Sequence, residues 1–345
     1  KTFSAVNLFG LTVGTACCLY ILLYVQDHRS YDTHHRDAAN LYRIISDLQF
    51  PNDQDKLHMA TCSPPIPMGI KAEFPEVEAA ARACRPIGVE MQILKAGDQV
   101  HYEKSGFYVD STFFQILDYH FTEGNPATAL NEPYSVVISE KLAKKMFNIH
   151  DALDQVIGIT TGDTEEKFKV TGVFSGVLGK SHLQSEFFMT MNSGGLGEYI
   201  RSSDSWAGNN FVYGYLRLKS GADPHALEAK LPAFLERRGA EQFQQMGMKK
   251  TLHLQPVSLI HTTSGLIADL PGNTGARFLQ ILILIAGFIQ LVACINFMNL
   301  TTARSTKRAQ EVGIRKATGA SRTALVGQFL GESMLLTVLA MAMAV

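Results

Sequence analysis

One run in the sequence is a candidate for binding a nucleotide. It reads Gly176-Val177-Leu178-Gly179-Lys180-Ser181 and ends like a phosphate-binding loop. Such a loop needs a further glycine five positions before its Gly-Lys-Ser, so that backbone amides surround the phosphates. Phe174 occupies that position. We therefore predict a strand-to-loop turn here, with no nucleotide or other cofactor bound.

Three histidines lie close together in the sequence, at His28, His34 and His35. A zinc site needs ligands at defined spacing and usually a carboxylate or cysteine partner, and no such set accompanies them. The sequence also lacks a nucleophile elbow and any specific cysteine–histidine or paired-carboxylate signature. These residue types predict no metal site, no catalytic residue and no enzymatic activity.

Charge is distributed very unevenly along the chain. The net charge is −1, which does not suggest a nucleic-acid-binding protein. No charged residue occurs from Thr2 to Gln26 or from Phe278 to Ala303, and a third apolar run, 323–345, carries one acid, Glu332. A bilayer span needs roughly 20 apolar residues. We predict transmembrane helices over 1–26, 278–303 and 323–345, the last truncated, in a piece of a longer protein.

The charges between the runs orient them. Residues 304–322 hold six basic side chains against the single acid Glu311, and positive loops stay in the cytoplasm. Residues 27–277 are then extracytoplasmic and 304–322 cytoplasmic. The first run has no small-x-small cleavage site before Asp27, so we predict an anchor and not a signal peptide.

The segment 27–277 alternates between strand and helix patterns. Strands are expected over 41–50, 88–94, 99–108, 135–138, 167–174, 211–218 and 252–257. Helices are expected over 66–82 with an interruption at Pro75, over 111–117 with Ser111 as N-cap, over 139–147 with Ser139 as N-cap, and over 223–238 with Asp223 as N-cap. This pattern predicts an α+β domain, organised in two lobes.

Two pairs of small residues suggest contacts. Cys62 and Cys84 lie in the outer segment, where disulfides persist, so they form a candidate disulfide that two cysteines alone leave open. Gly10 and Gly14 have the small-xxx-small spacing that lets transmembrane helices approach closely. We predict a helix–helix contact there.

The most specific motifs lie near the C-terminal end. Ala293-Cys294-Ile295-Asn296-Phe297-Met298-Asn299-Leu300 precedes the run Glu311-Val312-Gly313-Ile314-Arg315-Lys316-Ala317-Thr318-Gly319-Ala320-Ser321-Arg322. These runs resemble the permease subunit of the FtsX/MacB-like class of ABC transporters. Further segments that resemble this family are Asn7–Leu11, Tyr31-Asp32, Val137–Ala143, Lys169–Val173 and Ser181-His182-Leu183. The family often has a proline just before the last of these, where Gly179-Lys180 stands.

The resemblance implies a multi-pass protein of the bacterial inner membrane with a MacB-like periplasmic core domain between its first two spans. It implies a porter-like lobe near 40–85 and 210–262 and an inserted lobe near 86–205. The implied partners are a separate ABC ATPase, a second permease copy or second half, a periplasmic adaptor and the lipid bilayer. Whether the whole protein has four or eight spans stays open.

The resemblance also implies a role for the basic loop 304–322. Residues 308–320 would form a short helix that docks on the ATPase and relays its motion, through the spans, to the outer domain for export or extraction of a substrate. The implied coupling residues are Arg308, Glu311, Val312, Gly313, Ile314, Arg315, Lys316, Gly319 and Ala320. The alternative is a membrane-anchored peptide or ligand sensor that works with an ATPase.

Overall fold

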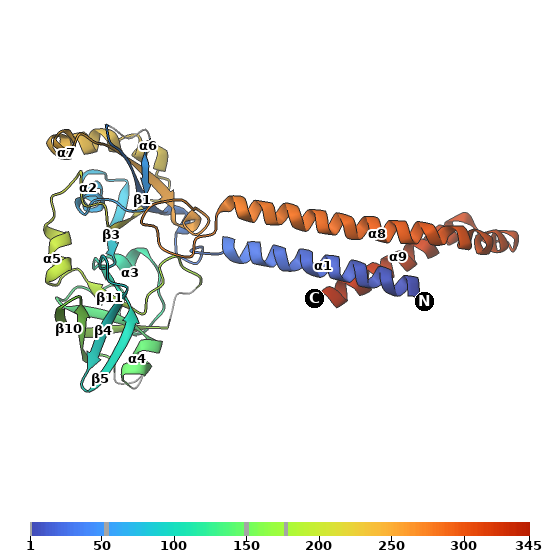
Figure 1. The fold of residues 1–345 in the computed structure, drawn as a ribbon, viewed down its shortest axis with the longest axis horizontal. Helices are drawn as coiled ribbons and strands as arrows, with labels where there is room; N and C mark the ends of the chain where they lie inside the picture. The colour runs from blue at the N-terminus through green and yellow to red at the C-terminus, as the bar shows by residue number, and fades with distance from the viewer. Residues whose placement is uncertain (1, 52–54, 148–151, 176–178) are drawn as a thin grey trace. The chain divides into compact units, whose positions relative to one another are not determined.

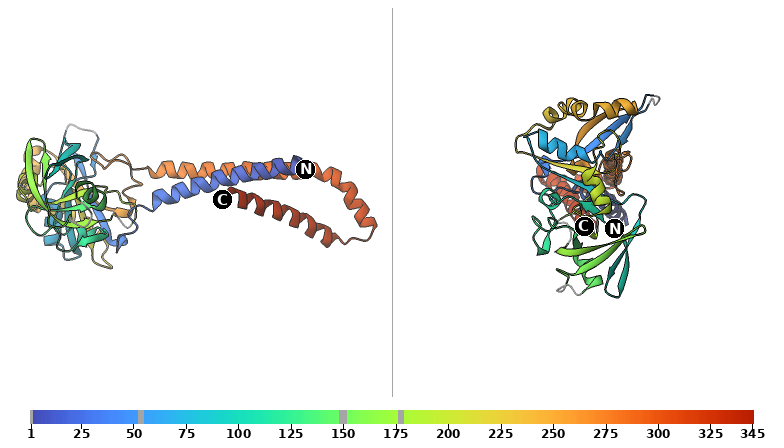
Figure 2. Two further views of the ribbon diagram at one scale, coloured as in Figure 1. Left: turned by 90° about the horizontal axis from the view of Figure 1, so that it is seen from below. Right: turned by 90° about the vertical axis from the view of Figure 1, so that its left-hand side faces the viewer.

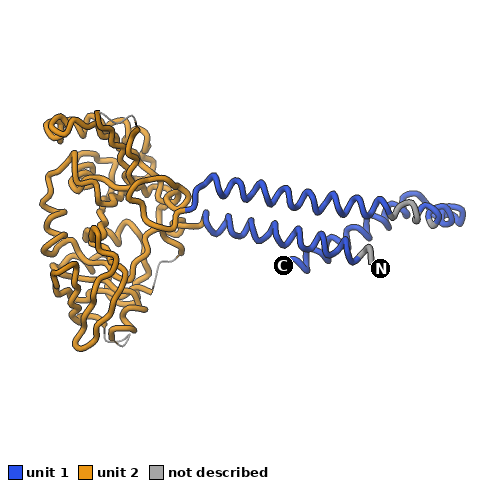
Figure 3. Tube along the Cα trace, viewed as in Figure 1, with its two compact units in different colours: residues 1–29, 274–345 blue, residues 30–273 orange. Residues whose placement is uncertain are grey.

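The computed structural model describes residues 2–51, 55–147, 152–175 and 179–345, with the side chains of 2–4, 304–308 and 311 left out. The chain divides into two compact units (Figure 3). The helical unit comprises residues 1–29 and 274–345, and the α+β unit comprises residues 30–273. Each unit is described by itself.

Three helices form the helical unit: α1 (Thr2–Arg29), α8 (Ala276–Ala317) and α9 (Arg322–Ala344) (Figure 1). Segments of all three are long and apolar enough to cross a membrane, namely Ala5–Arg29, Ala276–Ala303 and Arg322–Ala344. α1 packs against α8 and α9, and α9 runs back from the end of α8 (Figure 2). Many of their large apolar side chains are exposed, as expected for helices whose surroundings are lipid.

The helix that contains the second span does not end with the span at Ala303, so the prediction of a separate short helix over 308–320 is wrong. α8 continues for 42 residues without a break. Residues 304–317 contain no proline and are rich in arginine, lysine, alanine and glutamine, which favour helix. The helix stops at Thr318-Gly319, where Gly319 has φ +96°, a conformation that glycine adopts freely. Ser321 then caps α9 by accepting a hydrogen bond from the Ala324 amide at 3.3 Å.

One continuous mixed sheet organises the α+β unit. Its strands follow the order β13-β1-β12-β3-β6-β11-β8-β10-β9-β4-β5, with β2 beside β1 and β7 beside β10. The first lobe contains β1 (Leu41–Gln49), β2 (Leu57–Met59), β3 (Val77–Cys84), β12 (Tyr213–Leu218), β13 (Lys249–Pro256), α2 (Pro65–Glu73), α6 (Pro224–Glu228) and α7 (Leu231–Met246).

The second lobe holds the remaining elements. They are β4 (Met91–Ala96), β5 (Gln99–Lys104), β6 (Phe107–Val109), β7 (Phe121–Gly124), β8 (Ser135–Ser139), β9 (Val156–Thr161), β10 (Thr164–Phe174), β11 (Phe187–Thr190), α3 (Phe113–Ile116), α4 (Glu140–Met146) and α5 (Gly195–Ser202). The lobes join where Ala83 and Cys84 of β3 pair with Val109 and Tyr108 of β6. The predicted fold class, apolar helices flanking a two-lobed α+β domain, is confirmed.

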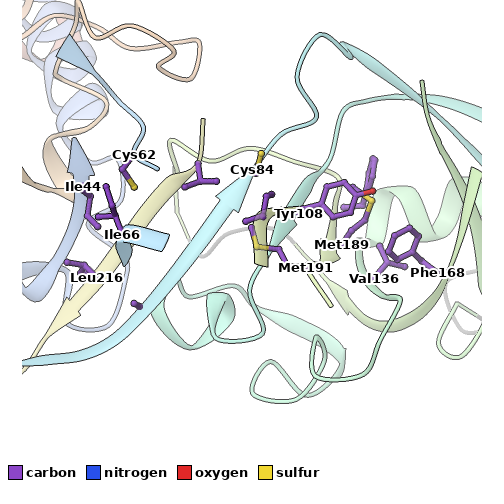
Figure 4. Close-up of a cluster of buried hydrophobic side chains, with 14 of the residues drawn as sticks. Ile44, Cys62, Ile66, Cys84, Tyr108, Val136, Phe168, Met189, Met191 and Leu216 are labelled. Atoms are coloured by element: carbon purple, nitrogen blue, oxygen red, sulfur yellow. The ribbon is translucent and has the colours of Figure 1, made fainter. Parts of the chain in front are cut away.

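Buried apolar side chains cover both faces of the sheet. β12 shows the alternation: Leu216 and Leu218 belong to the cluster under α2 and α7, whereas Tyr213 and Tyr215 belong to the opposite cluster. The first cluster extends through both lobes, from Ile44 and Leu216 to Val136 and Phe168 (Figure 4).

Three helix predictions need correction. The helix predicted over 66–82 ends at Glu73, and the alanine-rich part after Pro75 is strand β3, because pairing with β12 and β6 outweighs alanine's helix propensity. The helix over 111–117 shrinks to four residues, and Thr112, not Ser111, stands at its N-cap. The helix over 223–238 is two helices, α6 and α7, although Asp223 does cap α6 through the His225 amide at 2.9 Å.

The candidate disulfide between Cys62 and Cys84 is not formed. Both thiols are free and buried, and burial raises the pKa of each to about 12. Cys62 pairs with Val212, and the next residue, Tyr213, pairs with Ala83 on the other side. The cysteines are thus separated by the width of two strand spacings, about 9–10 Å, which a disulfide does not bridge. Figure 4 shows them apart.

Candidate functional site

The residues that the resemblance assigns to coupling lie in the last turns of α8 and in the short turn before α9. Gly313, Ile314, Arg315, Lys316 and Gly319 are exposed, and Val312 and Ala320 are partly buried. Arg308 and Glu311 belong to α8, and their side chains lie outside the described part of the structure. The Arg315 guanidinium donates to Gln328 Oε1 of α9 at 2.7 Å, which braces the turn.

Val312 and Ile314 do not lie on the same face of α8. Residues two apart on an α-helix point roughly 200° apart. The structure agrees, since Ile314 is 66% exposed while Val312 is partly buried. Ile314 is therefore the exposed apolar side chain at this end of α8, and the exposed cations Arg315 and Lys316 follow it.

The predicted helix-packing residues lie at the contact between α1 and α8. A Cβ placed on Gly14 would lie 2.6 Å from Cβ of Ala293, closer than side chains pack, and one on Gly10 would lie 3.2 Å from Asn296 Nδ2. Leu11 and Ala293 are buried beside them, with Ala340 of α9. Glycine at position 14 lets the two helices approach closely, in the manner of small-residue contacts in membranes.

A buried polar cluster holds the chain segment that follows α1. We call residues 30–40 the first connector. Asp32 is fully buried, and its two carboxylate oxygens, Oδ1 and Oδ2, accept from the His182 backbone amide at 3.2 and 3.1 Å. Oδ1 also lies 3.0 Å from His182 Nδ1. Burial opposes ionisation of Asp32, but the His182 imidazole, with His35 and Ser181, holds its pKa well below the usual range. His182 Nε2 lies 2.8 Å from the Tyr215 hydroxyl of β12.

The two motifs that meet here are distant in sequence. Tyr31-Asp32 and Ser181-His182-Leu183 each resemble the family in sequence, and the structure brings them together. Asp32 also donates its amide to the Lys180 carbonyl at 2.7 Å, so Lys180 and Ser181 contact a carboxylate-bearing turn. Residues 176–178 of the loop that resembles a phosphate loop lie outside the described residues.

A second polar cluster holds the segment that precedes α8. We call residues 260–273 the second connector. Arg43 of β1 is fully buried and donates to Asp269 at 2.6 and 3.3 Å, and to Gln255 Oε1 at 3.0 and 2.8 Å. The Tyr213 hydroxyl donates to the Ala268 carbonyl at 2.9 Å. One feature of the sequence indicates this cluster: Arg43 is two residues from Leu41 and so lies on the same face of the strand.

Ser63 and Lys250 lie within hydrogen-bond distance of each other in the α+β unit. Lys250 Nζ donates to Ser63 Oγ at 2.6 Å and to the Trp206 carbonyl at 2.7 Å, and burial lowers the pKa of Lys250 to about 7. A serine–lysine pair can activate a nucleophile. Ser63, however, is fully buried and also donates to backbone carbonyls of the 206–208 loop. The pair fastens that loop.

Two of the three neighbouring histidines, His34 and His35, lie in the first connector. The rings of His34 and His35 lie 4.0 Å apart, and His35 Nε2 lies 3.5 Å from Asp32. Among the described residues, no group of three or more histidine, cysteine, aspartate or glutamate side chains is arranged to hold a metal ion.

Comparison with known proteins gives the class of this chain. The MacB-like periplasmic core domain matches residues 4–234, and the FtsX-like permease C-terminal region matches residues 283–345. The chain therefore belongs to the MacB/FtsX-like family of ABC transporter permeases.

The comparisons also found individual similar proteins. An uncharacterised ABC transporter permease of Bacillus subtilis (strain 168), YknZ, is 29% identical over 208 residues, which are 59% of this chain and 45% of YknZ. The chain thus spans less than half the length of that relative. A crystallised domain of a permease protein from Porphyromonas gingivalis has the same fold, with a TM-score of 0.55 and 22% identity over 72% of this chain and all of that domain. The periplasmic region of MacB from Actinobacillus actinomycetemcomitans gives a TM-score of 0.43 and 13% identity over 66% of this chain and 95% of that region.

Proposed function

We propose that this chain is the permease subunit that couples ATP hydrolysis by a partner ATPase to movement of its own extracytoplasmic α+β unit, for export or extraction of a substrate. The observation that supports this most directly is the end of α8. A helix apolar enough to span a membrane continues unbroken into an exposed end, residues 312–320, which we call the tip. There the exposed Ile314 stands beside the cations Arg315 and Lys316. A rigid helix of this kind carries a push at one end to the other end, because its backbone is hydrogen bonded throughout.

The proposal includes a topology in a bacterial membrane. Residues 27–277 form the large domain on the periplasmic or extracellular side, and residues 304–322 lie in the cytoplasm. Single cysteines at Asp98, in the exposed β4–β5 turn, and at Thr318, in the exposed α8–α9 turn, test it in a cysteine-free background. An impermeant thiol reagent on intact cells, with any outer membrane permeabilised, is expected to label position 98 and spare position 318. The opposite labelling would invert the topology and exclude the coupling role.

The docking role of the tip is tested at Ile314. Ile314→Asp is expected to abolish co-purification with the ATPase, because an unpaired carboxylate is costly to bury in an apolar contact. The side chain is exposed in the free chain, so folding and membrane insertion are expected to be unchanged. Ile314→Leu keeps the apolar contact and serves as the matched control. If the aspartate variant still associates fully with the ATPase, the tip does not dock on it and is only a basic segment that sets the topology.

A further inference from the structure

We propose that one strand pair, β1 with β12, receives the motion of both connectors, and that Tyr213, Tyr215 and Arg43 are the positioning residues that transmit it. The proposal rests on the coupling function proposed above and specifies where in the α+β unit the motion arrives. It is carried by contacts within that unit alone, since both connectors belong to it.

The first connector is fixed to β12 through a chain of buried polar groups. It follows α1 directly and places Asp32 against His182, whose other ring nitrogen lies 2.8 Å from the Tyr215 hydroxyl. All three side chains are at most 1% exposed. Because water does not compete for these groups, each bond is more costly to leave unmade than on a surface.

The second connector is fixed to the same place. Tyr213 is two residues before Tyr215 and therefore lies on the same face of β12. Its hydroxyl bonds the Ala268 carbonyl, and Arg43 pairs with Asp269, the next residue. Arg43 is the direct cross-strand partner of Tyr215 in the register of β1 and β12. Three adjacent side chains on one sheet face thus hold both connectors.

The two connectors also contact each other, and the backbone at both anchor residues has an unusual conformation. The ring of Tyr31 in the first connector stacks on His261 in the second, with centroids 3.5 Å apart and planes within 3°. Asp32 and Ala268, the residues at the two anchor points, both have φ of +57°. Residues other than glycine rarely adopt that conformation, and it persists where surrounding contacts enforce it. Asp32 and Ala268 therefore hold the connectors rigidly to the sheet, so that a movement of a connector moves the strands it contacts.

The sheet gives this anchor a route to the second lobe. β12 pairs with β3 over six residues, and β3 pairs with β6. A displacement applied to β1 and β12 is thereby delivered to the strand that joins the two lobes, without passing through a loop.

The test compares nucleotide-dependent hydrogen–deuterium exchange in the full chain bound to its ATPase, in wild type and in Tyr213→Phe/Tyr215→Phe. In wild type, a non-hydrolysable ATP analogue is expected to change exchange in the connectors, in β1 and β12, and in β6. The double variant keeps ring volume and loses only two hydroxyls. Exchange in the connectors is expected to be faster by roughly fivefold per lost hydrogen bond. The nucleotide-dependent change in β1, β12 and β6 is expected to disappear while ATPase association and turnover stay normal.

Tyr108→Phe is the matched control, since Tyr108 is equally buried and its hydroxyl bonds Glu166 in the second lobe, away from both connectors. It is expected to leave the nucleotide response of β1 and β12 intact. A full response in the double variant would overturn the proposed anchor while leaving the coupling function standing. No response of the α+β unit in wild type would instead refute the coupling function, and the anchor with it.

Discussion

Replacing Asp269 with alanine is expected to lower the free energy of unfolding of the α+β unit by about 3–5 kcal/mol, the usual cost of removing one partner from a buried ion pair. Arg43 is fully buried, and among the described residues its side chain keeps only Gln255 as a hydrogen-bond partner once the carboxylate is gone. An arginine side chain keeps its charge in proteins, so loss of a proton does not relieve the penalty. A loss of this size is a large share of the stability of a domain.

The measurement is simple because the chain has one tryptophan. Trp206 lies in the α+β unit, so its fluorescence during denaturant unfolding of the full chain in detergent reports that unit alone. Arg43→Met/Asp269→Ala removes both charges and is expected to be more stable than Asp269→Ala. Equal stability of Asp269→Ala and wild type would show that the pair contributes nothing to folding, and that Arg43 is satisfied without it.

Local patterns sufficed for much of the fold. The absence of charge over two long runs predicted α1 and the apolar part of α8, because a membrane span is a property of consecutive residues. Ser139 and Asp223 were predicted as N-caps, and each makes its hydrogen bond to a nearby backbone amide. Such contacts reach only two or three positions along the chain, so sequence spacing describes them well.

Contacts set by distant segments were not predictable in this way. Residues 77–84 have a helical composition and form a strand because β12 and β6 lie on either side. The Asp32–His182 contact joins residues 150 positions apart, and neither motif shows the other as its partner. Tyr213 and Tyr215 have the sequence pattern of ordinary strand residues, and only their hydrogen bonds to Ala268 and His182 in the folded chain show that they contact the connector clusters.

The proposed docking helix was predicted as an isolated element, and its continuity with the span changes what a proline should do. Gly313→Pro removes the hydrogen bond from residue 313 to the carbonyl four residues earlier and clashes with it, at a cost of about 3 kcal/mol or more. In an isolated helix of one or two turns that would simply unfold the segment. In α8 it severs the last turn, Ile314 to Ala317, from a helix that is otherwise intact.

Gly313→Pro is therefore expected to give a protein that inserts into the membrane in normal amount, folds its α+β unit and binds its ATPase weakly, with an affinity loss on the order of a hundredfold if the helix cost falls wholly on the docked state. Insertion should survive because the apolar part of α8 ends at Ala303, ten residues before the substitution. The matched control is Gly313→Ala, since alanine favours helix and a Cβ at this position meets none of the described atoms outside the neighbouring helix backbone within 4 Å. The alanine variant is expected to couple as well as wild type or better. Equal ATPase affinity and turnover of the proline and alanine variants would show that the tip need not be helical to work, and that α8 does not transmit motion through it.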